Sequence, residues 1–243
     1  MTHTTTCKTP HLTLPPPHVP QAHHRGIGRL AAAHLMVHIE PYPAMDEGDL
    51  IELLWGGCYV TSKTVNAADI GQTIALRVPE SFLQNGKVKI SYRIMKIGDL
   101  PEASIPCTLW VRLDLPGGQL LDPDTEENQG LEPLTLPDPV LQRGLHSSHM
   151  LDGMPVSIAP YLNMAAHDEI TLRWGDLRMD LPALSADEVG MPVTFTVPPE
   201  FIREACVEEA QEITYCIIDR AGNNSRWAPT RIINTSNIAK KTL

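Results

Sequence analysis

The sequence predicts an all-β protein built from two tandem β-sandwich domains, each introduced by an extended, proline-rich leader segment. Three observations support this prediction: an internal duplication, apolar residues that alternate with period two, and 22 prolines in 243 residues. Proline is not tolerated inside a helix, so this composition favours strands, extended segments and turns.

The duplication is clearest around Trp55 and Trp174, which lie 119 residues apart. With this offset, ten of the twenty positions from 37 to 56 are identical, including Pro-Tyr, a Met, an Asp and the final Trp-Gly. After four extra residues around "REACVEEAQ" the offset becomes 123, as at Tyr92 and Tyr215. Self-similarity at a fixed period over this length indicates two copies of one structural unit.

Each copy also extends backward from its tryptophan. "LTLPPP" (12–17) matches "LTLPDP" (134–139), and each lies about twenty residues before a Val-x-Ile. The predicted division is a flexible N-terminus at 1–11, unit 1 at 12–118 with its leader at 12–33, an acidic linker at 119–130, unit 2 at 131–236 with its leader at 131–152, and a C-terminal tail at 237–243.

Period-two alternation indicates half-buried strands in both copies. The alternating segments are "LMVHIE" from Leu35, "LIELLW", "TIALRV" and "VKISYRIM" in the first copy, and "EITLRW", "VTFTV" and "EITYCII" in the second. "PPEFIREACVEEAQ" predicts one short helix with Pro199 in its first turn, and "PESFLQN" a single turn. Six or seven short strands in about 100 residues are typical of a β-sandwich.

One segment resembles a known family. "YCIIDRAGNNSRWAP" (215–229) is similar to the last hairpin of bacterial immunoglobulin-like repeat domains, in which a Tyr-rich strand runs into Asp-x-Ala-Gly-Asn-x-Ser and a final strand follows. "RIMKIGDLPEAS" of the first copy keeps Gly98 and Ser104 but lacks the Ala-Gly-Asn core. The resemblance implies an immunoglobulin-like sandwich of the kind used in bacterial surface, secreted or adhesin-type arrays, and it implies no catalytic residue.

The charge distribution argues against nucleic acid and anionic membrane as partners. The formal net charge is −10, and the stretch from Pro116 to Gly153 contains seven acidic residues and one Arg. Phosphate-binding surfaces need clustered Lys and Arg. The first thirty residues contain no apolar segment typical of a secretory signal, and no run approaches a membrane span, so we expect a cytoplasmic location or export by a signal-independent route.

The five cysteines form no framework shared by the two copies. The offsets place Leu177 opposite Cys58 and Arg93 opposite Cys216, so free thiols are expected. Cys58 and Cys107 fall near strand ends and could lie near one another. The other cysteines are Cys7 and Cys206.

Two repeated residue pairs suggest chemistry but also have a structural interpretation. Trp55 and Trp174 each end an alternating strand, where a tryptophan usually packs between the sheets. Asp49 and Asp168 begin the same strand in separate units, so we expect them to accept hydrogen bonds from the turn after Met45 and Met164 rather than to act as paired catalytic carboxylates.

Histidines are concentrated at the N-terminal end and could bind Zn²⁺ or Ni²⁺. Their spacings match no ordered zinc module, and a flexible, polar leader is the favoured interpretation. These seven of the ten histidines are His3, His11, His18, His23, His24, His34 and His38.

"DPDTEENQG" (122–130) places oxygen ligands at alternate positions, as calcium loops do. It lacks the Gly of an EF-hand at the sixth position and has Pro123 where the chain must curl. A looser calcium site therefore stays as the alternative to a solvated acidic linker. The sequence predicts no cofactor.

No catalytic motif is present: the sequence has no Gly-x-Ser-x-Gly and no phosphate-binding glycine loop. The leading hypothesis is a non-enzymatic binding or structural protein whose divergent loops recognise a protein or cell-surface ligand. The diverging segments are 56–67 against 175–186, and 97–104 against 219–226. Two alternatives are an accessory subunit of a secreted toxin or injection apparatus that docks through its leader, and a lectin-like protein that uses exposed aromatics such as Tyr59 and Trp227.

Overall fold

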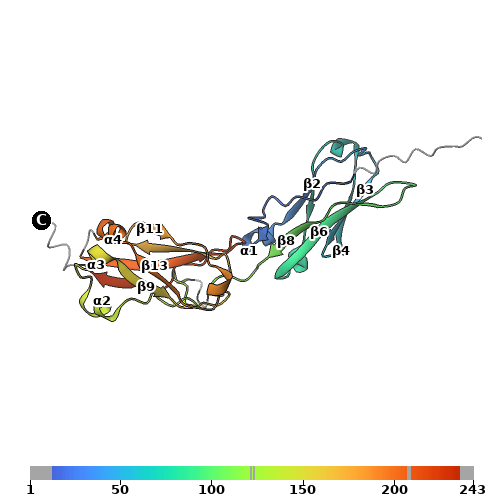
Figure 1. The fold of residues 1–243 in the computed structure, drawn as a ribbon. Coiled ribbons are helices and arrows are strands. Elements are labelled where there is room, and N and C mark those ends of the chain that lie inside the picture. Colours follow the sequence, from blue (N-terminus) through green and yellow to red (C-terminus); the bar gives the residue numbers. More distant parts are fainter. Residues whose placement is uncertain (1–12, 121, 123, 207–208, 236–243) are drawn as a thin grey trace, which may run out of the picture. The chain divides into compact units, whose positions relative to one another are not determined.

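A computed structural model describes residues 13–120, 122, 124–206 and 209–235 of the chain (Figure 1). The chain divides into two compact units, Met1–Leu113 and Asp114–Leu243, and each has its own hydrophobic core. Within the described residues, no helix is long and apolar enough to cross a membrane.

Unit 1 consists of two sheets. The larger has the order β1-β8-β6-β3-β4, with β7 added to β6, and the smaller pairs β2 with β5. The elements are β1 (Gly26–Ile27), α1 (Arg29–Ala33), β2 (Met36–Ile39), β3 (Leu50–Trp55), β4 (Cys58–Thr64), the 3-10 turn η1 (Ala67–Asp69), β5 (Ile74–Arg77), η2 (Glu80–Phe82), β6 (Gly86–Met95), β7 (Glu102–Ala103) and β8 (Cys107–Val111).

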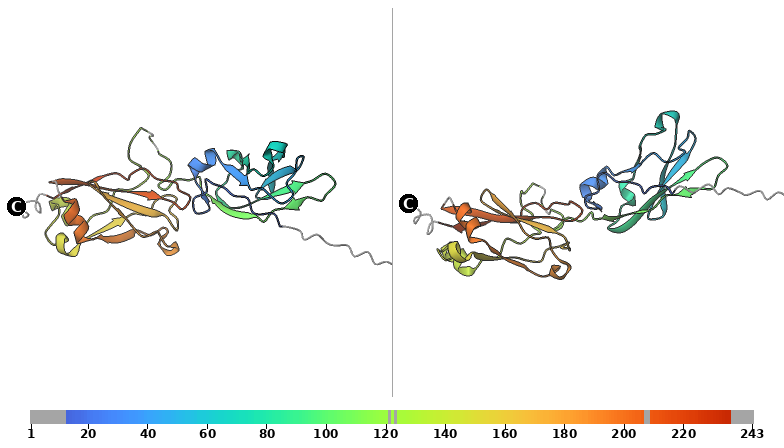
Figure 2. Two further views of the ribbon diagram at one scale, coloured as in Figure 1. Left: turned by 90° about the horizontal axis from the view of Figure 1, so that it is seen from above. Right: turned by 45° about the horizontal axis from the view of Figure 1, so that its top comes forward.

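Unit 2 repeats this arrangement. One sheet has the order β11-β10-β13-β14 and the other pairs β12 with β9. The elements are α2 (Asp138–Arg143), α3 (His149–Asp152), β9 (Met154–Ile158), β10 (Glu169–Trp174), β11 (Leu177–Asp180), η3 (Ala186–Glu188), β12 (Val193–Val197), α4 (Pro199–Ala205), β13 (Ala210–Ile218) and β14 (Arg231–Asn234). In both views of Figure 2 the helices α2 and α3 (yellow-green) and α4 (orange) lie at the same end of this unit.

The predicted immunoglobulin-like sandwich is confirmed. In each unit a two-stranded and a larger, mainly antiparallel sheet enclose the core, and strands distant in sequence pair within each sheet, as in Greek-key sandwiches. β4 pairs with β3 and not with β5, and β11 pairs with β10 and not with β12, so β4 and β11 both lie at a sheet edge.

Alternation of apolar residues places one face of each strand in the core, as predicted. The central strand pairs have the same inward register in both units: Leu53 faces Tyr92 and Leu172 faces Tyr215, while each tryptophan faces an isoleucine. These side chains are buried in both copies. The duplicated residues therefore specify the same core packing in each unit.

The two central tyrosines differ in one respect. The Tyr215 hydroxyl donates a hydrogen bond of 2.7 Å to the main-chain oxygen of Glu132. The Tyr92 hydroxyl is buried and has no hydrogen-bond partner among the described residues. Burial raises the pKa of Tyr92 to about 12. A hydroxyl removed from water without a partner opposes folding.

The boundary between the units differs from the predicted one. Contacts divide the chain after Leu113, and part of the predicted acidic linker packs into unit 2. Asn128 is buried, its amide nitrogen donates to the main-chain oxygen of Pro116, and its backbone N–H donates to that of Trp227. Buried main-chain groups need hydrogen-bond partners, and these bonds satisfy polar groups that water would solvate in an exposed linker.

The leader of unit 1 is not a flexible arm in its described part. Leu14, Val19 and Ile27 are buried in the core of unit 1, and β1 pairs in parallel with β8. The predicted flexible N-terminus, 1–11, lies outside the described residues, as does the tail at 237–243. Prolines keep the first part of this leader extended, but its end forms α1, and the leader of unit 2, predicted to be extended, contains α2 and α3. The apolar residues of the unit 1 leader make it a component of the sandwich.

The diverging segments at 56–67 and 175–186 are not loops throughout. They contain the edge strands β4 and β11, each antiparallel to the preceding strand. None of the residues of β4 or β11 is fully buried, because an edge strand exposes much of both its faces. The helix predicted at Pro199 is confirmed as α4, and the single turn predicted in "PESFLQN" is confirmed as η2.

The two central tyrosines allow a matched test of core energetics. We expect Tyr215→Phe to lower the free energy of unfolding by about 1 kcal/mol, because it leaves the carbonyl of Glu132 without its donor. Tyr92→Phe should be neutral or stabilising, since it removes a buried hydroxyl that has no described partner. Urea denaturation of both variants measures this, and equal losses would contradict it.

Candidate functional site

The first candidate is the turn that carries the repeated aspartates. The Tyr42 hydroxyl donates a hydrogen bond of 2.9 Å to Oδ2 of Asp49, and the Tyr161 hydroxyl donates one of 2.9 Å to Oδ2 of Asp168. The same oxygen accepts from the backbone N–H of Asp46 in unit 1 at 3.1 Å and of Ala165 in unit 2 at 2.9 Å. Asp46 and Ala165 directly follow the two repeated methionines.

The predicted role of the aspartates is therefore confirmed. Each accepts hydrogen bonds from its own turn, and both are buried. The hydroxyl donors were missed because Tyr and Asp lie on opposite sides of an irregular turn, where neither helix nor strand periodicity applies. In unit 1, Lys96 Nζ also lies 3.3 Å from Oδ2 of Asp49. A carboxylate held by these donors organises the turn and leaves little capacity for acid–base chemistry.

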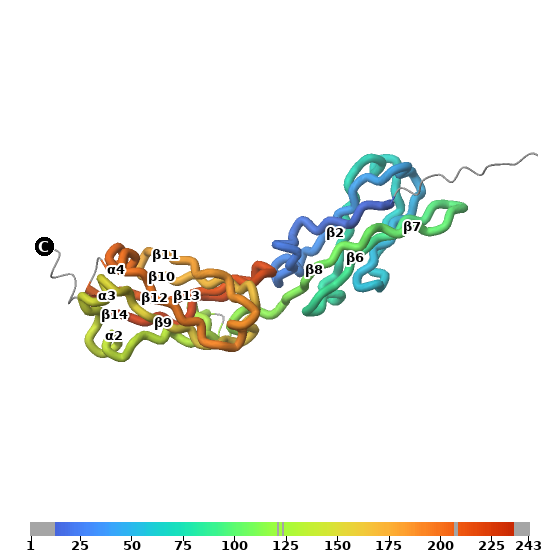
Figure 3. The backbone as a smooth tube through the Cα atoms, viewed as in Figure 1, coloured from blue at the N-terminus to red at the C-terminus, as the bar shows by residue number. Residues whose placement is uncertain are grey.

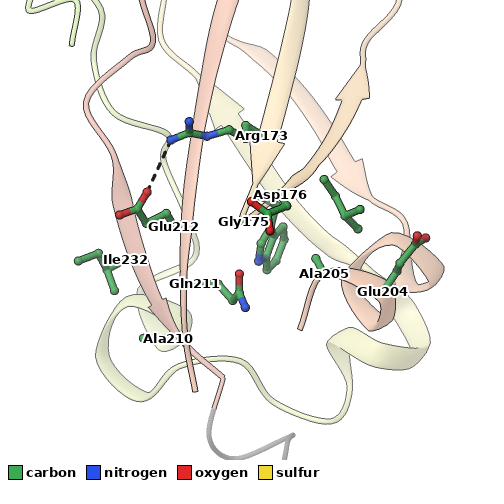
Figure 4. A pocket seen from close by; sticks show the side chains of 11 residues that line it. Arg173, Gly175, Asp176, Glu204, Ala205, Ala210, Gln211, Glu212 and Ile232 are labelled. Carbon is green, nitrogen blue, oxygen red and sulfur yellow. Dashed lines mark ion pairs between the residues drawn. The ribbon is translucent and has the colours of Figure 1, made fainter. Parts of the chain in front are cut away.

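Both tryptophans lie in the core, as predicted, but Trp174 lies beside an open pocket. This pocket has a volume of about 510 Å³ and is formed by the ends of β10, α4, β13 and the start of β11 (Figure 4). Trp174 is fully buried, and its Nε1–H has no hydrogen-bond partner within the described residues. A buried donor without an acceptor costs free energy unless a ligand or water satisfies it.

Unit 2 differs from unit 1 at the wall of this pocket. Gln211 occupies the position of Val88 in the duplication, at an inward position of the central strand, and its side chain is buried. Gly175 has a positive φ of 56°, and a Cβ there would collide with Oε1 of Gln211. Glycine is thus required for both its backbone conformation and its close approach to the amide.

The sequence change that creates the pocket wall is the four-residue insertion of unit 2. The insertion accompanies a longer helix, α4, whose residues Glu204 and Ala205 line the pocket. The rim is acidic, because Asp176 and Glu204 take part in none of the described ion pairs. Glu212 also lines the pocket, but its Oε2 lies 3.6 Å from Nη2 of Arg173. Sequence reasoning identified the insertion but gave it no function.

The aromatics suggested for a lectin-like site differ in accessibility. Tyr59 is 52% exposed at the edge strand β4, whereas Trp227 is only partly exposed. The guanidinium carbons of Arg173 and Arg178 lie 4.9 Å and 5.5 Å from the centre of the Trp227 ring. Trp227 thus has a structural role in cation–π contacts that compete with stacking on a sugar.

The described cysteines form no nucleophilic centre. Burial raises the pKa of Cys206 to about 11, and it also raises the pKa of Cys216, so both remain protonated thiols near neutral pH. Cys58 of β4 and Cys107 of β8 are aligned across the larger sheet, and two strands lie between them. At the usual distance between neighbouring strands they are about 14 Å apart. They are not neighbours, and all four are free.

The described parts of the chain contain no group of three or more His, Cys, Asp or Glu side chains suited to hold a metal ion. In the acidic stretch, Asp122 accepts from the backbone N–H of Asp124, and Glu127 accepts from that of Thr230. Asp122 thus stabilises its own turn and Glu127 joins this stretch to the segment before β14, and the looser calcium site has no support in this geometry.

No protein-family model and no curated protein matches the chain. Similar solved structures include a bacterial ice-binding adhesin, with 13% identity over 86% of this chain and 60% of that one, at a TM-score of 0.37. Fibronectin(III)-like modules of Clostridium thermocellum CbhA share 10% identity over 91% of this chain and 96% of that one, at a TM-score of 0.45. A tetra-tandem repeat from the extending region of a large adhesion protein shares 12% identity over 91% and 49%, at a TM-score of 0.35.

The chain thus spans about 60% of the length of the adhesin structure. The similar structures are fibronectin-III-like and adhesin tandem-repeat domains. The sandwich itself is established by the strand order of each unit.

The Tyr–Asp contact of each turn can be tested by removing only the hydroxyl. We expect Tyr42→Phe and Tyr161→Phe each to lower the free energy of unfolding by about 1.5–3 kcal/mol, because a buried carboxylate loses a donor. Tyr59→Phe, which removes an exposed hydroxyl bonded to Ser62, should cost less than about 0.5 kcal/mol. Chemical denaturation checks the three variants, and similar losses in all would refute the role of the turn.

Tyrosine ionisation also predicts a dependence of stability on pH. Burial, followed by the hydrogen bond to Asp49, raises the pKa of Tyr42, and burial raises that of Tyr92. The folded state thus favours the protonated phenols. Their contribution to the free energy of unfolding is fully present below about pH 10, the pKa of tyrosine in the unfolded chain. It is lost as the pH rises above this value. Unfolding free energies at pH 9 and pH 11 should show this loss, and Tyr42→Phe should reduce it.

Proposed function

We propose that the chain is a non-enzymatic binding protein that recognises a protein or cell-surface ligand through the parts in which its two units differ. The observation that carries this proposal is the distribution of differences between the copies. The central strand pairs and the Tyr–Asp turn are the same in both units. The edge strands, the connections after β6 and β13, and the pocket wall differ.

The chemistry of the differing parts supports recognition rather than catalysis. Edge strand β4 carries Tyr59 and small polar residues, whereas β11 carries Arg178 and Asp180. The connection after β6 presents Ile97 and Leu100, both largely exposed. Exposed apolar side chains on a connecting segment are typical of contact surfaces.

The pocket beside Trp174 adds a specific subsite to this proposal. Trp174 and Gln211 line this pocket together with the acidic residues Asp176 and Glu204. An indole N–H only donates, so a ligand group there must supply an acceptor oxygen. The carboxylates of the rim favour a ligand that also carries positive charge.

The alternatives receive less support. A docking role for the leader conflicts with the burial of Leu14, Val19 and Ile27, because a truncation beginning at Ala31 would remove part of the core. A lectin-like role would have to use Tyr59, since the ring of Trp227 is engaged by two arginines.

Exchange of the edge strands tests the proposal. Residues 56–67 and 175–186 have equal length, so each can replace the other in the full chain. We expect affinity capture from the native cells and their medium to recover a partner with the natural chain, and to lose it with at least one of the two exchanges. Circular dichroism confirms that each variant folds. Capture of identical partners by both exchanged chains would count against recognition through these strands.

The pocket can be tested separately by copying unit 1 into unit 2. We expect Gln211→Val to weaken capture of the partner at least tenfold while leaving the free energy of unfolding unchanged or higher, because the buried amide is replaced by the apolar residue of unit 1. Val88→Ile, at the matching position of unit 1, is the control. Unchanged affinity of the Gln211 variant would remove the pocket from the binding surface.

A further inference from the structure

Two histidines that are twenty residues apart in sequence lie directly opposite one another in unit 1. The backbone N–H of His18 in the leader donates a 2.9 Å hydrogen bond to the main-chain oxygen of His38 in β2, and the N–H of His38 donates one of 2.7 Å in return. This reciprocal pair is an antiparallel bridge, so both side chains project from the same face. Figure 3 shows β2 among the blue segments of the leader.

The two imidazole rings are already close. Their centroids lie 6.4 Å apart with an interplanar angle of 68°. His18 is exposed and His38 is partly exposed, so solvent ions reach both rings. On its other side His38 pairs with Ala75 of β5, whose small side chain leaves room for a bound ion.

The neighbouring charges on this face are few. Glu40 lies two residues beyond His38 and accepts a hydrogen bond of 2.9 Å from the hydroxyl of Thr73. Arg77 lies opposite Met36 in the register of β2 and β5. On the leader, Pro16 and Pro20 flank His18 at the same-face positions and carry no charge. The imidazoles are thus the metal-binding groups at this place.

We propose that His18 and His38 form a two-histidine site for a divalent transition-metal ion of the type that imidazole nitrogen prefers, such as Ni²⁺, Cu²⁺ or Zn²⁺. Two metal–nitrogen bonds of about 2.0–2.1 Å bring ring centroids to about 5 Å apart, which small side-chain rotations achieve from the observed separation. Water fills the remaining coordination positions, since no third protein ligand gathers among the described residues.

A bound ion has a structural consequence for unit 1. It joins the leader to β2 through side chains in addition to the two backbone hydrogen bonds, and so it stabilises the folded state over the unfolded chain. The prolines that flank His18 restrict the leader before the ion binds, which lowers the entropy lost on binding. The bound ion thus holds the leader against β2 at the edge of the smaller sheet.

Isothermal titration of Ni²⁺ into the full chain tests the proposal. His3 and His11, which lie outside the described residues, are changed to Ala in every sample so that they contribute no signal. We expect His18→Ala and His38→Ala each to weaken Ni²⁺ binding at least tenfold and to abolish the rise in Tm that the ion produces. His34→Ala is the matched control, because His34 is exposed and lies outside the paired residues of β2.

The adjacent rings of His23 and His24, with centroids 4.3 Å apart, provide a second control. Binding that is lost only when this pair is changed to Ala, or that is equal in all variants, overturns the proposal. If a His18 or His38 variant misfolds, Zn²⁺ titration of the chain that keeps both histidines measures metal binding independently. The imidazole NMR signals of His18 and His38 should shift together, and shifts elsewhere alone would contradict the site.

Discussion

The buried carboxylate at the turn between the two sheets is the constraint on which each unit depends. In unit 1 the chain leaves β2 of the smaller sheet and enters β3 of the larger one, and Asp49 holds this crossing through Tyr42 and the backbone of the turn. The main chain of Asp49 also accepts from Val65 at the end of the β4 segment. In unit 2, Asp168, Tyr161 and Leu184 make the same contacts. A buried carboxylate is compatible with a stable fold only when all of its hydrogen-bond donors are in position. Asp49 and Asp168 therefore fix one geometry of the turn between the two sheets.

With that crossing fixed, the remaining parts of the sandwich are free to differ. Each central pair of strands presents the same apolar residues to the core, and a core of given volume and pattern tolerates changes at its periphery. Edge strands have only one hydrogen-bonded neighbour and expose much of both faces, so their sequence is weakly constrained by packing. The divergence of β4 from β11 follows from their place in the sheet, which makes them suitable for presenting different surfaces.

The polar atoms without described partners lie in different surroundings in the two units. In unit 1 the Tyr92 hydroxyl is enclosed by the core. In unit 2 the Trp174 indole N–H borders an open pocket whose wall contains Gln211. Each is a buried donor without a described partner, and only the second belongs to a residue that lines a pocket. The pocket lies where unit 2 differs from unit 1 by Gln211 in place of Val88 and by the insertion after α4.

The sequence by itself determined the duplication, the strands, the core faces, α4 and the turn role of the aspartates, because each depends on local periodicity or on short-range contacts. Period two specifies which side chains face inward, and a matched offset transfers every conclusion from one copy to the other. Only the tertiary structure decided the packing of the leader and of Asn128, the strand character of 56–67, the pocket beside Trp174 and the pairing of His18 with His38. Apart from β4, which forms a tight hairpin with β3, these features join residues far apart in the chain. Such contacts leave no period or spacing in the sequence, because the tertiary fold brings the residues together.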